Sequence, residues 1–293
     1  MRKRMAALLL AAALLLSLSG CGVFDTKLAR AVQKMSKLDS LRLELQAEAV
    51  LAVEGPAEQD GGQAALQLPA SCSGVFDLKV KPLLVKGETA LQYPGGGQKH
   101  LACIEQKDGA YYLYSRANAG SLWQKRGLAQ WDKLQVSGLR YIVQGAETFS
   151  EVGREEIKGS PATRYDGLLA GEYLEGLLQL YGVEELLRDG LGFQLAEGLF
   201  SGMKDIPASL WLDESSGMVV RLQLDLRDCA ADLAARQLRQ SRDASGFDAL
   251  GLSLSLESLL VTVDLGQFDA IEDISIPDEA RAAWGEDTKQ PWE

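Results

Sequence analysis

The residues best suited to chemistry in this chain are four cysteines and a single histidine. A structural zinc site uses four cysteine or histidine ligands, usually including a Cys-x-x-Cys pair, and the sequence contains no such pair. His100 follows the glycine-rich stretch Pro94–Gly97 without a second ligand nearby, so we interpret it as a solvated loop residue and the stretch as a flexible hairpin loop. We therefore expect neither a metal site nor a cofactor.

Catalytic motifs are missing as well. The sequence has no Gly-x-Ser-x-Gly elbow, no Walker loop and no His-Glu-x-x-His helix. Gly190-Leu191-Gly192 could begin a dinucleotide-binding loop, but a third glycine and a preceding parallel βαβ unit are absent. The carboxylates are too numerous and too scattered to indicate a glycosidase pair. These absences argue against an enzyme.

The first cysteine, Cys21, stands where an apolar run gives way to a polar chain. The chain begins with MRKRM, continues with AALLLAAALLLSL and reaches Cys21 after small residues. This order is typical of an export signal, and the apolar run is shorter than the roughly 20 residues that span a bilayer. The alternative is an ordinary signal peptide in which the cysteine is incidental.

The four residues Leu18, Ser19, Gly20 and Cys21 are similar to the lipobox of bacterial lipoproteins. This resemblance implies that the chain is cut before Cys21 and that the Cys21 sulfur receives a diacylglyceryl group. Two or three acyl chains, at about 0.8 kcal/mol for each buried methylene, hold a protein stably on a membrane. We therefore expect a protein that its N-terminal lipid anchors to the extracytoplasmic face of a bacterial membrane.

The net charge excludes one class of partner. The formal charge of −11 becomes −14 without residues 1–20, which contain three cations and no acidic residue. Nucleic acids require a basic face, so they are excluded as partners. The same charge should repel anionic headgroups, which leaves the lipid alone to hold the chain on the membrane.

Three further cysteines follow the anchor: Cys72, Cys103 and Cys229. A disulfide is permitted outside the cytoplasm, but three thiols allow three different single pairings and leave one thiol free. Buried free thiols are equally compatible with the sequence.

Alternating hydrophobicity dominates the chain after its first helix. Residues 40–55 (SLRLELQAEAVLAVEG) alternate apolar and polar side chains over most of their length, which is typical of an antiparallel strand with one wet face. Further strands are expected in GVFDLKVKP, LLVKGETALQY, HLACIEQ, AYYLYS and LWQKR. We predict a break near Lys81-Pro82 and a hairpin turn at Lys107-Asp108-Gly109.

Strands return in the second half of the chain. EVGREEIKGSPATRYDGLLA indicates two strands about a Gly159-Ser160-Pro161 turn, and a second hairpin is expected around Asp213–Gly217. In LSLSLESLLVTVDL the apolar positions are even-numbered through Leu256 and odd-numbered from Leu259. Such a change of phase near Ser258 predicts a bulge or a sharply curved strand.

Helices are expected in three places. The first, within GVFDTKLARAVQKMSKLDS, has Leu28, Val32 and Met35 at helical spacing, and we expect it to pack against the domain. The second lies in segment 173–200, where leucines and tyrosines recur at helical spacing and glycines divide the segment into two or three helices. The third is CAADLAARQLRQ.

This order of elements predicts an α+β domain. Its centre is a large, curved, mostly antiparallel β-sheet that forms an open half-barrel, with helices packed on the concave face. We assign residues 1–20 to the signal peptide, 21–25 to a lipidated tether, 26–285 to a single domain and 286–293 to a polar C-terminal tail.

The sequence resembles the superfamily of LolA and LolB lipoprotein carriers and the mycobacterial LppX- and LprG-like lipoproteins. The resembling features are the lipobox at Cys21, the opening KMSKLDSLRLELQAEAVLAV, the hairpin SLWLDESSGMVVRLQLDL and the ending FDAIEDISIPDEARAA. The resemblance covers nearly the whole mature chain. It implies a half-barrel sheet, covered by helices, that holds acyl chains or lipidated partners.

Three functional hypotheses follow from these patterns. The first is a lipoprotein that binds a lipid or acyl chain between the sheet and its helices. The second is a non-enzymatic envelope interaction or sensory module, with a filled core and an envelope protein or peptidoglycan as its partner. The third is a Ca²⁺-dependent module, which rests on acidity alone because no Asp-x-Asp-x-Asp-Gly loop is present.

The first hypothesis places the ligand between the inner face of the strands and the helical middle of the chain. The alternative is that the same side chains form plain core. The candidate ligand-contacting residues are Leu174, Leu177, Leu178, Tyr181, Leu187, Leu191 and Leu195.

The lipobox assignment predicts the effect of Cys21→Ala. Without the sulfur, both lipid transfer and cleavage of the leader should fail, so the variant should lose fatty-acid labelling and stable membrane attachment. Membrane fractionation and labelling with a fatty-acid probe measure these effects. A Cys21→Ala variant that still carried the label in the membrane fraction would contradict the assignment.

Overall fold

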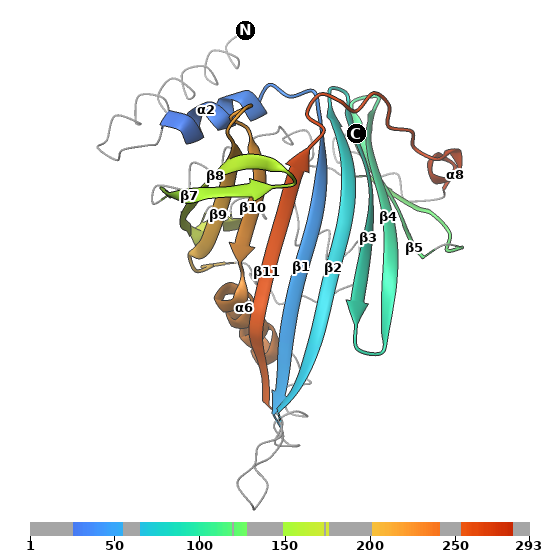
Figure 1. Cartoon of the computed structure of the whole chain (residues 1–293). Helices are drawn as coiled ribbons and strands as arrows, with labels where there is room; N and C mark the ends of the chain where they lie inside the picture. Colours follow the sequence, from blue (N-terminus) through green and yellow to red (C-terminus); the bar gives the residue numbers. More distant parts are fainter. Residues whose placement is uncertain are drawn as a thin grey trace, which may run out of the picture.

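The computed structural model describes residues 26–54, 65–118, 120–127, 149–172, 174–175, 201–240 and 253–283. Its main feature is one antiparallel sheet of eleven strands in the order β6-β5-β4-β3-β2-β1-β11-β10-β9-β8-β7 (Figure 1). The strands are β1 (Ser40–Glu54), β2 (Ala65–Val80), β3 (Leu83–Tyr93), β4 (Gly96–Lys107), β5 (Ala110–Ala117), β6 (Gln124–Gly127), β7 (Ser150–Ile157), β8 (Ser160–Leu169), β9 (Ile206–Asp213), β10 (Val219–Asp225) and β11 (Ser253–Gly266). Strands β6 and β7 form the two edges and do not pair, so the sheet is open, as the sequence predicts.

The longest strands lie at the centre of the sheet. Strand β1 pairs along nearly its whole length with β2 on one side and with β11 on the other. These three strands have 15, 16 and 14 residues, respectively. Because β11 comes from the far end of the sequence, it joins the meander β1 to β6 to the group β7 to β10.

The strand register separates apolar from charged side chains. Leu43 on β1 lies directly opposite Phe76 on β2 and Leu265 on β11, whereas its neighbour Arg42 lies opposite Asp77. Directly opposed residues of an antiparallel pair point to the same face. We call the face that carries Leu43 the inner face and the face that carries Arg42 the outer face.

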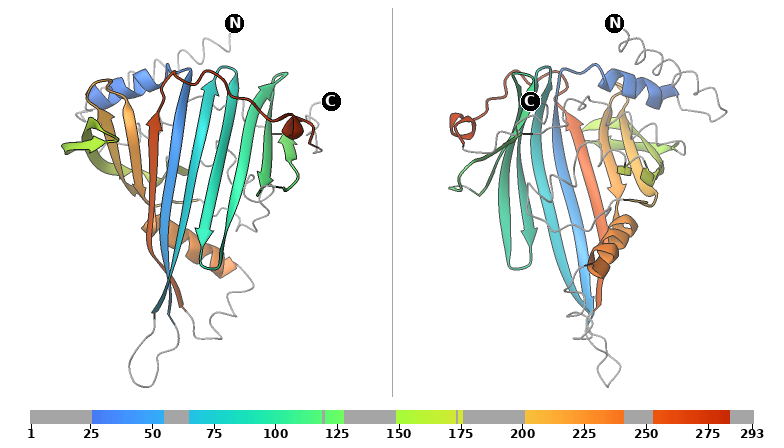
Figure 2. Two further views of the ribbon diagram at one scale, coloured as in Figure 1. Left: turned by 45° about the vertical axis from the view of Figure 1, so that its right-hand side comes forward. Right: turned by 180° about the vertical axis from the view of Figure 1, so that it is seen from behind.

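Two helices pack on the inner face. Helix α2 (Thr26–Met35) buries Leu28 and Met35 against the inner side chains of the sheet, as predicted from their spacing. Helix α6 (Arg227–Gln240) buries Cys229 in the same cluster. The sheet curves around this side, and Figure 2 shows α6 in front of β11 when the molecule is seen from behind. The predicted curved, open sheet with helices on its concave face is therefore confirmed.

The predicted change of phase in the last strand is a bulge. Val50 pairs with Ser258 and the next residue, Leu51, pairs with Leu256, so Glu257 is the additional residue on β11. A bulge of this kind shifts the alternation by one position. As a result, Leu256 below the bulge and Leu259 above it both point to the inner face.

Two local predictions are wrong. The β7–β8 turn consists of Lys158 and Gly159, both with positive φ (51° and 84°), while Pro161 lies within β8 opposite Glu156. His100 lies in β4 opposite Thr89 and is half-buried, so it is not a loop residue. In contrast, the β4–β5 turn at Asp108 is confirmed, with φ of 53°.

The C-terminal segment crosses the outer face. Helix α8 (Asp278–Arg281) follows it and buries Ala280 beside Cys103, Tyr114 and Trp123. Cys103 and Tyr114 are opposed residues of β4 and β5 on the outer face, because their register follows that of Arg42 across the intervening strands. This segment therefore covers the half of the sheet farther from α6 (Figure 2).

A buried carboxylate joins α8 to the sheet. Glu105 is only 5% exposed and accepts hydrogen bonds from the Tyr114 hydroxyl at 2.8 Å and from Arg281 at 3.1 Å. A buried carboxylate that lost these donors would retain its desolvation cost without compensation. These bonds therefore hold the C-terminal segment to β4 and β5.

Tyr114→Phe should lower the free energy of unfolding by about 1–3 kcal/mol at neutral pH, because Glu105 loses one donor. Burial and the hydrogen bond to Glu105 raise the pKa of Tyr114, so the folded protein keeps a proton that the unfolded chain releases above about pH 10. The stabilisation is thus complete below about pH 10 and decreases at higher pH. Urea unfolding at about pH 8 and pH 11 measures both effects.

The matched control is Tyr111→Phe, which changes the other face of β5 and should leave the free energy of unfolding nearly unchanged. A difference between wild type and Tyr114→Phe that stayed constant from pH 8 to pH 11 would contradict the titration of Tyr114.

Candidate functional site

The candidate site is an apolar strip on the inner face of the central strands. On β1 its members are Leu45, Ala47 and Ala49, which lie opposite inner-face residues of β2 and β11. All of these β1 side chains are half-buried, in contrast to the fully buried cluster under α2. The opposed members are Val263, Val261 and Leu259 on β11 and Gly74, Cys72 and Ala70 on β2.

The strip carries no carboxylate, lysine or arginine. Outside the cluster under α2 it extends along β1 from Leu45 to Leu51, and at about 3.3 Å per residue this is roughly 20 Å. The hydrocarbon core of a bilayer, which holds two layers of acyl chains end to end, is about 30 Å thick. The strip is therefore long enough for an extended acyl chain.

Small residues keep one part of the strip flat. The Phe76 ring lies over Gly87 on β3, so closely that a Cβ on Gly87 would be 2.0 Å from a ring carbon. A Cβ on Gly74 would also approach the ring, at 2.9 Å. The two glycines allow the ring to lie against the backbone, where it widens the apolar surface from β2 to β3.

Of the predicted ligand-contacting residues, only Leu174 lies within the described part of the chain. It is half-buried and packs against the cluster under α2. The other six, Leu177, Leu178, Tyr181, Leu187, Leu191 and Leu195, lie outside the described residues. Leu18, Ser19, Gly20 and Cys21 of the lipobox also lie outside them. The predicted site has a strand side and a helical side, and the described residues contain mainly the strand side.

The three cysteines that follow Cys21 are free thiols, so none of the three possible pairings is formed. Cys72 lies on the inner face of β2, whereas Cys103 lies on the outer face of β4. Burial raises the pKa of Cys72, Cys103 and Cys229, which keeps the thiols protonated at neutral pH. On the apolar strip Cys72 therefore behaves as a small uncharged side chain.

The outer face behind the strip is polar and carries ion pairs. Arg221 contacts Asp264 through two hydrogen bonds of 2.5 and 2.9 Å, and Arg42 contacts Asp77 in the same way at 2.6 and 2.9 Å. Burial alone would raise the pKa of Asp264, but the hydrogen bonds and charges of Arg221 and Lys158 lower it below its usual value. These pairs make the outer face suited to water and not to an apolar ligand.

An aromatic side chain continues this outer network toward β8. The Trp211 ring lies between the guanidinium groups of Arg164 and Arg221, whose central carbons are 5.1 and 6.0 Å from its centroid. The indole N–H of Trp211 donates to Glu155 at 2.8 Å. The ring is thereby buried on a face that is otherwise charged.

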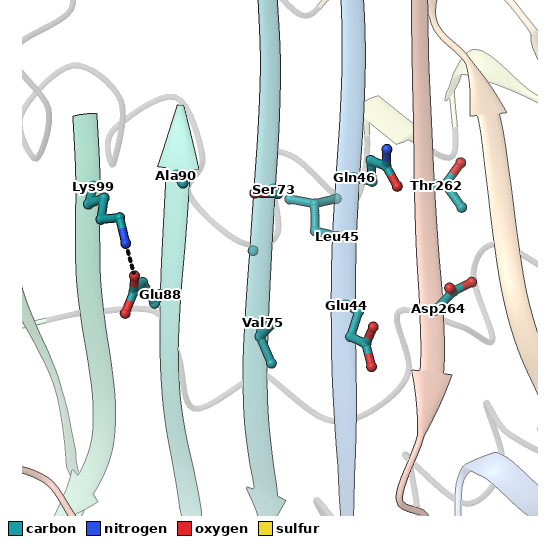
Figure 3. A pocket seen from close by; sticks show the side chains of 11 residues that line it. Glu44, Leu45, Gln46, Ser73, Val75, Glu88, Ala90, Lys99, Thr262 and Asp264 are labelled. Carbon is teal, nitrogen blue, oxygen red and sulfur yellow. Dashed lines mark hydrogen bonds and ion pairs between the residues drawn. The ribbon is translucent and has the colours of Figure 1, made fainter. Parts of the chain in front are cut away.

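A shallow hollow of about 510 Å³ lies on the outer face between β4 and β11 (Figure 3). Its side chains include the carboxylates Glu44, Glu88 and Asp264, and Lys99, which contacts Glu88 at 3.2 Å. Among the described residues no group of three histidine, cysteine or acidic side chains could hold a metal ion. The ion pairs neutralise the charges of this hollow, so we interpret it as solvated surface.

None of the described helices combines the length and apolar character needed to cross a membrane.

Comparison with known proteins gives similarity only among solved structures. No protein-family model and no curated protein matches the chain. The crystal structure of the Mycobacterium tuberculosis lipoprotein LppX has a TM-score of 0.43 and 12% sequence identity, covering 85% of this chain and 96% of that chain. The structure of LprF from Mycobacterium bovis has a TM-score of 0.42 and 13% identity, covering 87% and 95%.

The ion pair between Arg221 and Asp264 predicts that Asp264→Asn lowers the stability of the fold. The Asp264 side chain is only 12% exposed, so its loss leaves a partly buried guanidinium poorly paired and should lower the free energy of unfolding by about 1.5–3 kcal/mol at neutral pH. Because the folded state lowers the pKa of Asp264, this stabilisation exists above about pH 4 and disappears as the pH falls through the folded-state pKa. Urea unfolding at about pH 7 and pH 3 should show the difference between the two proteins shrinking.

The matched control is Glu88→Gln, which breaks an exposed pair and should change the free energy of unfolding by less than about 1 kcal/mol. Equal effects of the two substitutions at neutral pH would show that the Asp264 pair has no special structural role.

Proposed function

We propose that this chain is a non-enzymatic lipoprotein that binds a lipid or acyl chain on the inner face of its sheet. The observation that carries the proposal is the uncharged, half-buried strip along β1, β2 and β11. Ligand pockets for apolar molecules are concave and lined mainly by hydrophobic side chains. The inner face of the curved sheet has both properties, whereas the hollow on the outer face is lined by charged side chains.

The strip offers enough apolar contact for useful affinity. Each buried methylene contributes about 0.8 kcal/mol, so on the order of ten methylenes would supply about 8 kcal/mol before the costs of association. Binding then costs the translational and rotational freedom of the ligand, which reduces the net value. We therefore expect recognition by length and shape of the apolar chain.

The proposed anchor places this strip near a source of ligand. Only four residues, 22–25, separate Cys21 from the first residue of α2, and they span at most about 13 Å. A lipid on Cys21 would thus hold the domain beside the extracytoplasmic surface of a bacterial membrane. Membrane lipids would be the nearest apolar molecules.

Native mass spectrometry with lipid extraction tests the proposal. Residues 22–293, purified without detergent from bacteria, should carry a stoichiometric additional mass that extracts as phospholipid, glycolipid or fatty acid. A clean apo mass that did not change after incubation with lipids would overturn the proposal. It would then favour the envelope interaction module, and crosslinking would be the way to find its partner.

The Ala47→Trp substitution tests whether the ligand lies on the apolar strip. Ala47 is at the middle of the strip between Cys72 and Val261, so an indole ring there would occupy the space of the acyl chain and reduce the lipid-bound fraction at least tenfold. The matched control is Gln46→Trp, which places the same ring on the outer face and should leave binding unchanged. Equal lipid content in both variants would place the ligand elsewhere.

A further inference from the structure

Helix α2 is a basic surface on an acidic protein. Between Thr26 and Leu38 the chain has four cations and no acidic residue, although its formal net charge is −11. The cations are Lys27, Arg30, Lys34 and Lys37. The spacing of Lys27, Arg30 and Lys34 places them along one side of the helix, beside the stripe that packs on the sheet, and Lys37 lies in the turn that follows the helix. All four side chains are exposed.

The contacts of α2 leave most of this charge unneutralised. Lys27 contacts Glu151 at 3.0 Å, whereas the Lys34 ammonium donates to the Ser216 carbonyl at 2.6 Å and pairs with no carboxylate of the described residues. Within the described part of the chain, Arg30 and Lys37 form no ion pair. Arg30 and Lys34 of α2 and Lys37 in the turn after it are thus available to an external anion.

A hollow of about 400 Å³ lies beside α2, where the helix meets β8, β9 and the β9–β10 turn. Its lining includes Lys27, Arg30 and Lys34 from α2 and Arg154 from β7. It also contains two carboxylates that already have donors. Glu214 contacts Arg154 at 2.8 Å, and Asp213 accepts from the Ser215 hydroxyl at 2.6 Å. The hollow is therefore a concave, mainly cationic surface at the end of the sheet.

The predicted lipidation site, Cys21, is close in sequence to the basic surface of α2. Figure 1 shows α2 at one end of the molecule, across the ends of the β9 and β10 strands. The segment that contains Cys21 precedes α2 by four residues. If Cys21 carries the lipid, as the proposed function holds, α2 is the described element nearest to the bilayer.

We infer that the exposed side of α2, with the adjoining hollow, docks on the anionic phospholipid headgroups of the membrane that anchors the protein. Each lysine or arginine close to an anionic membrane surface increases the binding constant about fivefold. Three such cations together contribute roughly a hundredfold. The acidic residues beside α2 are Glu151, which pairs with Lys27, and Asp213 and Glu214, which line the hollow and already have donors. Acidic residues farther away than the Debye length of about 8–10 Å weaken the attraction little near physiological salt. The expectation from net charge, that the domain is repelled by headgroups, is replaced by attraction through one end.

Vesicle cosedimentation of residues 22–293 tests this inference without the anchor, since the described fold begins at Thr26. At about 0.1 M salt the protein should bind vesicles of phosphatidylcholine with 30% phosphatidylglycerol at least tenfold better than vesicles of phosphatidylcholine alone. Binding should disappear at about 0.5 M salt because the attraction is electrostatic. Equal binding to both vesicles, or none to either, would overturn the inference.

Arg30→Glu with Lys37→Glu should abolish the preference for phosphatidylglycerol. Both side chains are exposed, glutamate at position 30 is a good helix former and Lys37 lies after the last residue of the helix, so α2 should remain folded. The control is Lys99→Glu with Arg227→Glu, which makes the same change of net charge away from α2 and should retain at least half of the binding. Equal losses in the two double variants would show that only net charge matters and would overturn the inference.

This experiment does not depend on the proposed function. The bound lipid is measured on protein from bacteria, and lipidation is measured at Cys21, whereas cosedimentation uses the unlipidated chain. A failure of headgroup docking would therefore leave the proposed ligand site and the anchor standing.

Discussion

The structure depends on the register of β1 with its two neighbours. Side chains in a strand alternate between faces, so a slip of one residue would move every inner side chain to the outer face. Here the pairing aligns Leu43 with Phe76 and Leu265, and Arg42 with Asp77. A slip would bury the charged set and expose the apolar set, at a cost of several kcal/mol for each uncompensated charge. The separation of the two faces follows from this single constraint.

The bulge at Glu257 maintains this register over the length of β11. Without it, Leu256 would face outward when Leu259 and Val261 face inward. The sequence records the bulge directly, because the apolar positions change from even to odd numbers. Features of this kind can be predicted because each depends on a pattern within one strand. The alternation of β1, the turn at Asp108 and the amphipathic α2 were predictable for the same reason.

Other features depend on contacts between distant segments. Helix α8 has four residues and one buried side chain, Ala280, so its sequence contains no sign of the face that it covers. Its position is determined by Glu105, a residue far away in the chain, through Arg281. His100 was expected in a loop because glycines precede it, yet pairing with β3 extends β4 as far as Gly96, and His100 also pairs with Ala117 of β5. Of the site, the sequence indicated the apolar inner face, whereas the flat packing of Phe76 on Gly87 required the register of β2 with β3.

The two faces of the sheet lie back to back, and this has an electrostatic consequence for the apolar strip. Only one layer of backbone separates Leu45 and Val263 from the outer charges of Glu44 and Asp264, a separation well under the roughly 10 Å between packed sheets. Water on the outer face screens the exposed Glu44, whereas the Asp264 side chain is only 12% exposed and is screened less. A neutral hydrocarbon chain is indifferent to the field of these charges, whereas a charged headgroup at the strip would feel it. The sheet thus prevents contact between the two faces, but the charges of the outer face still contribute to the electrostatic potential at the inner face.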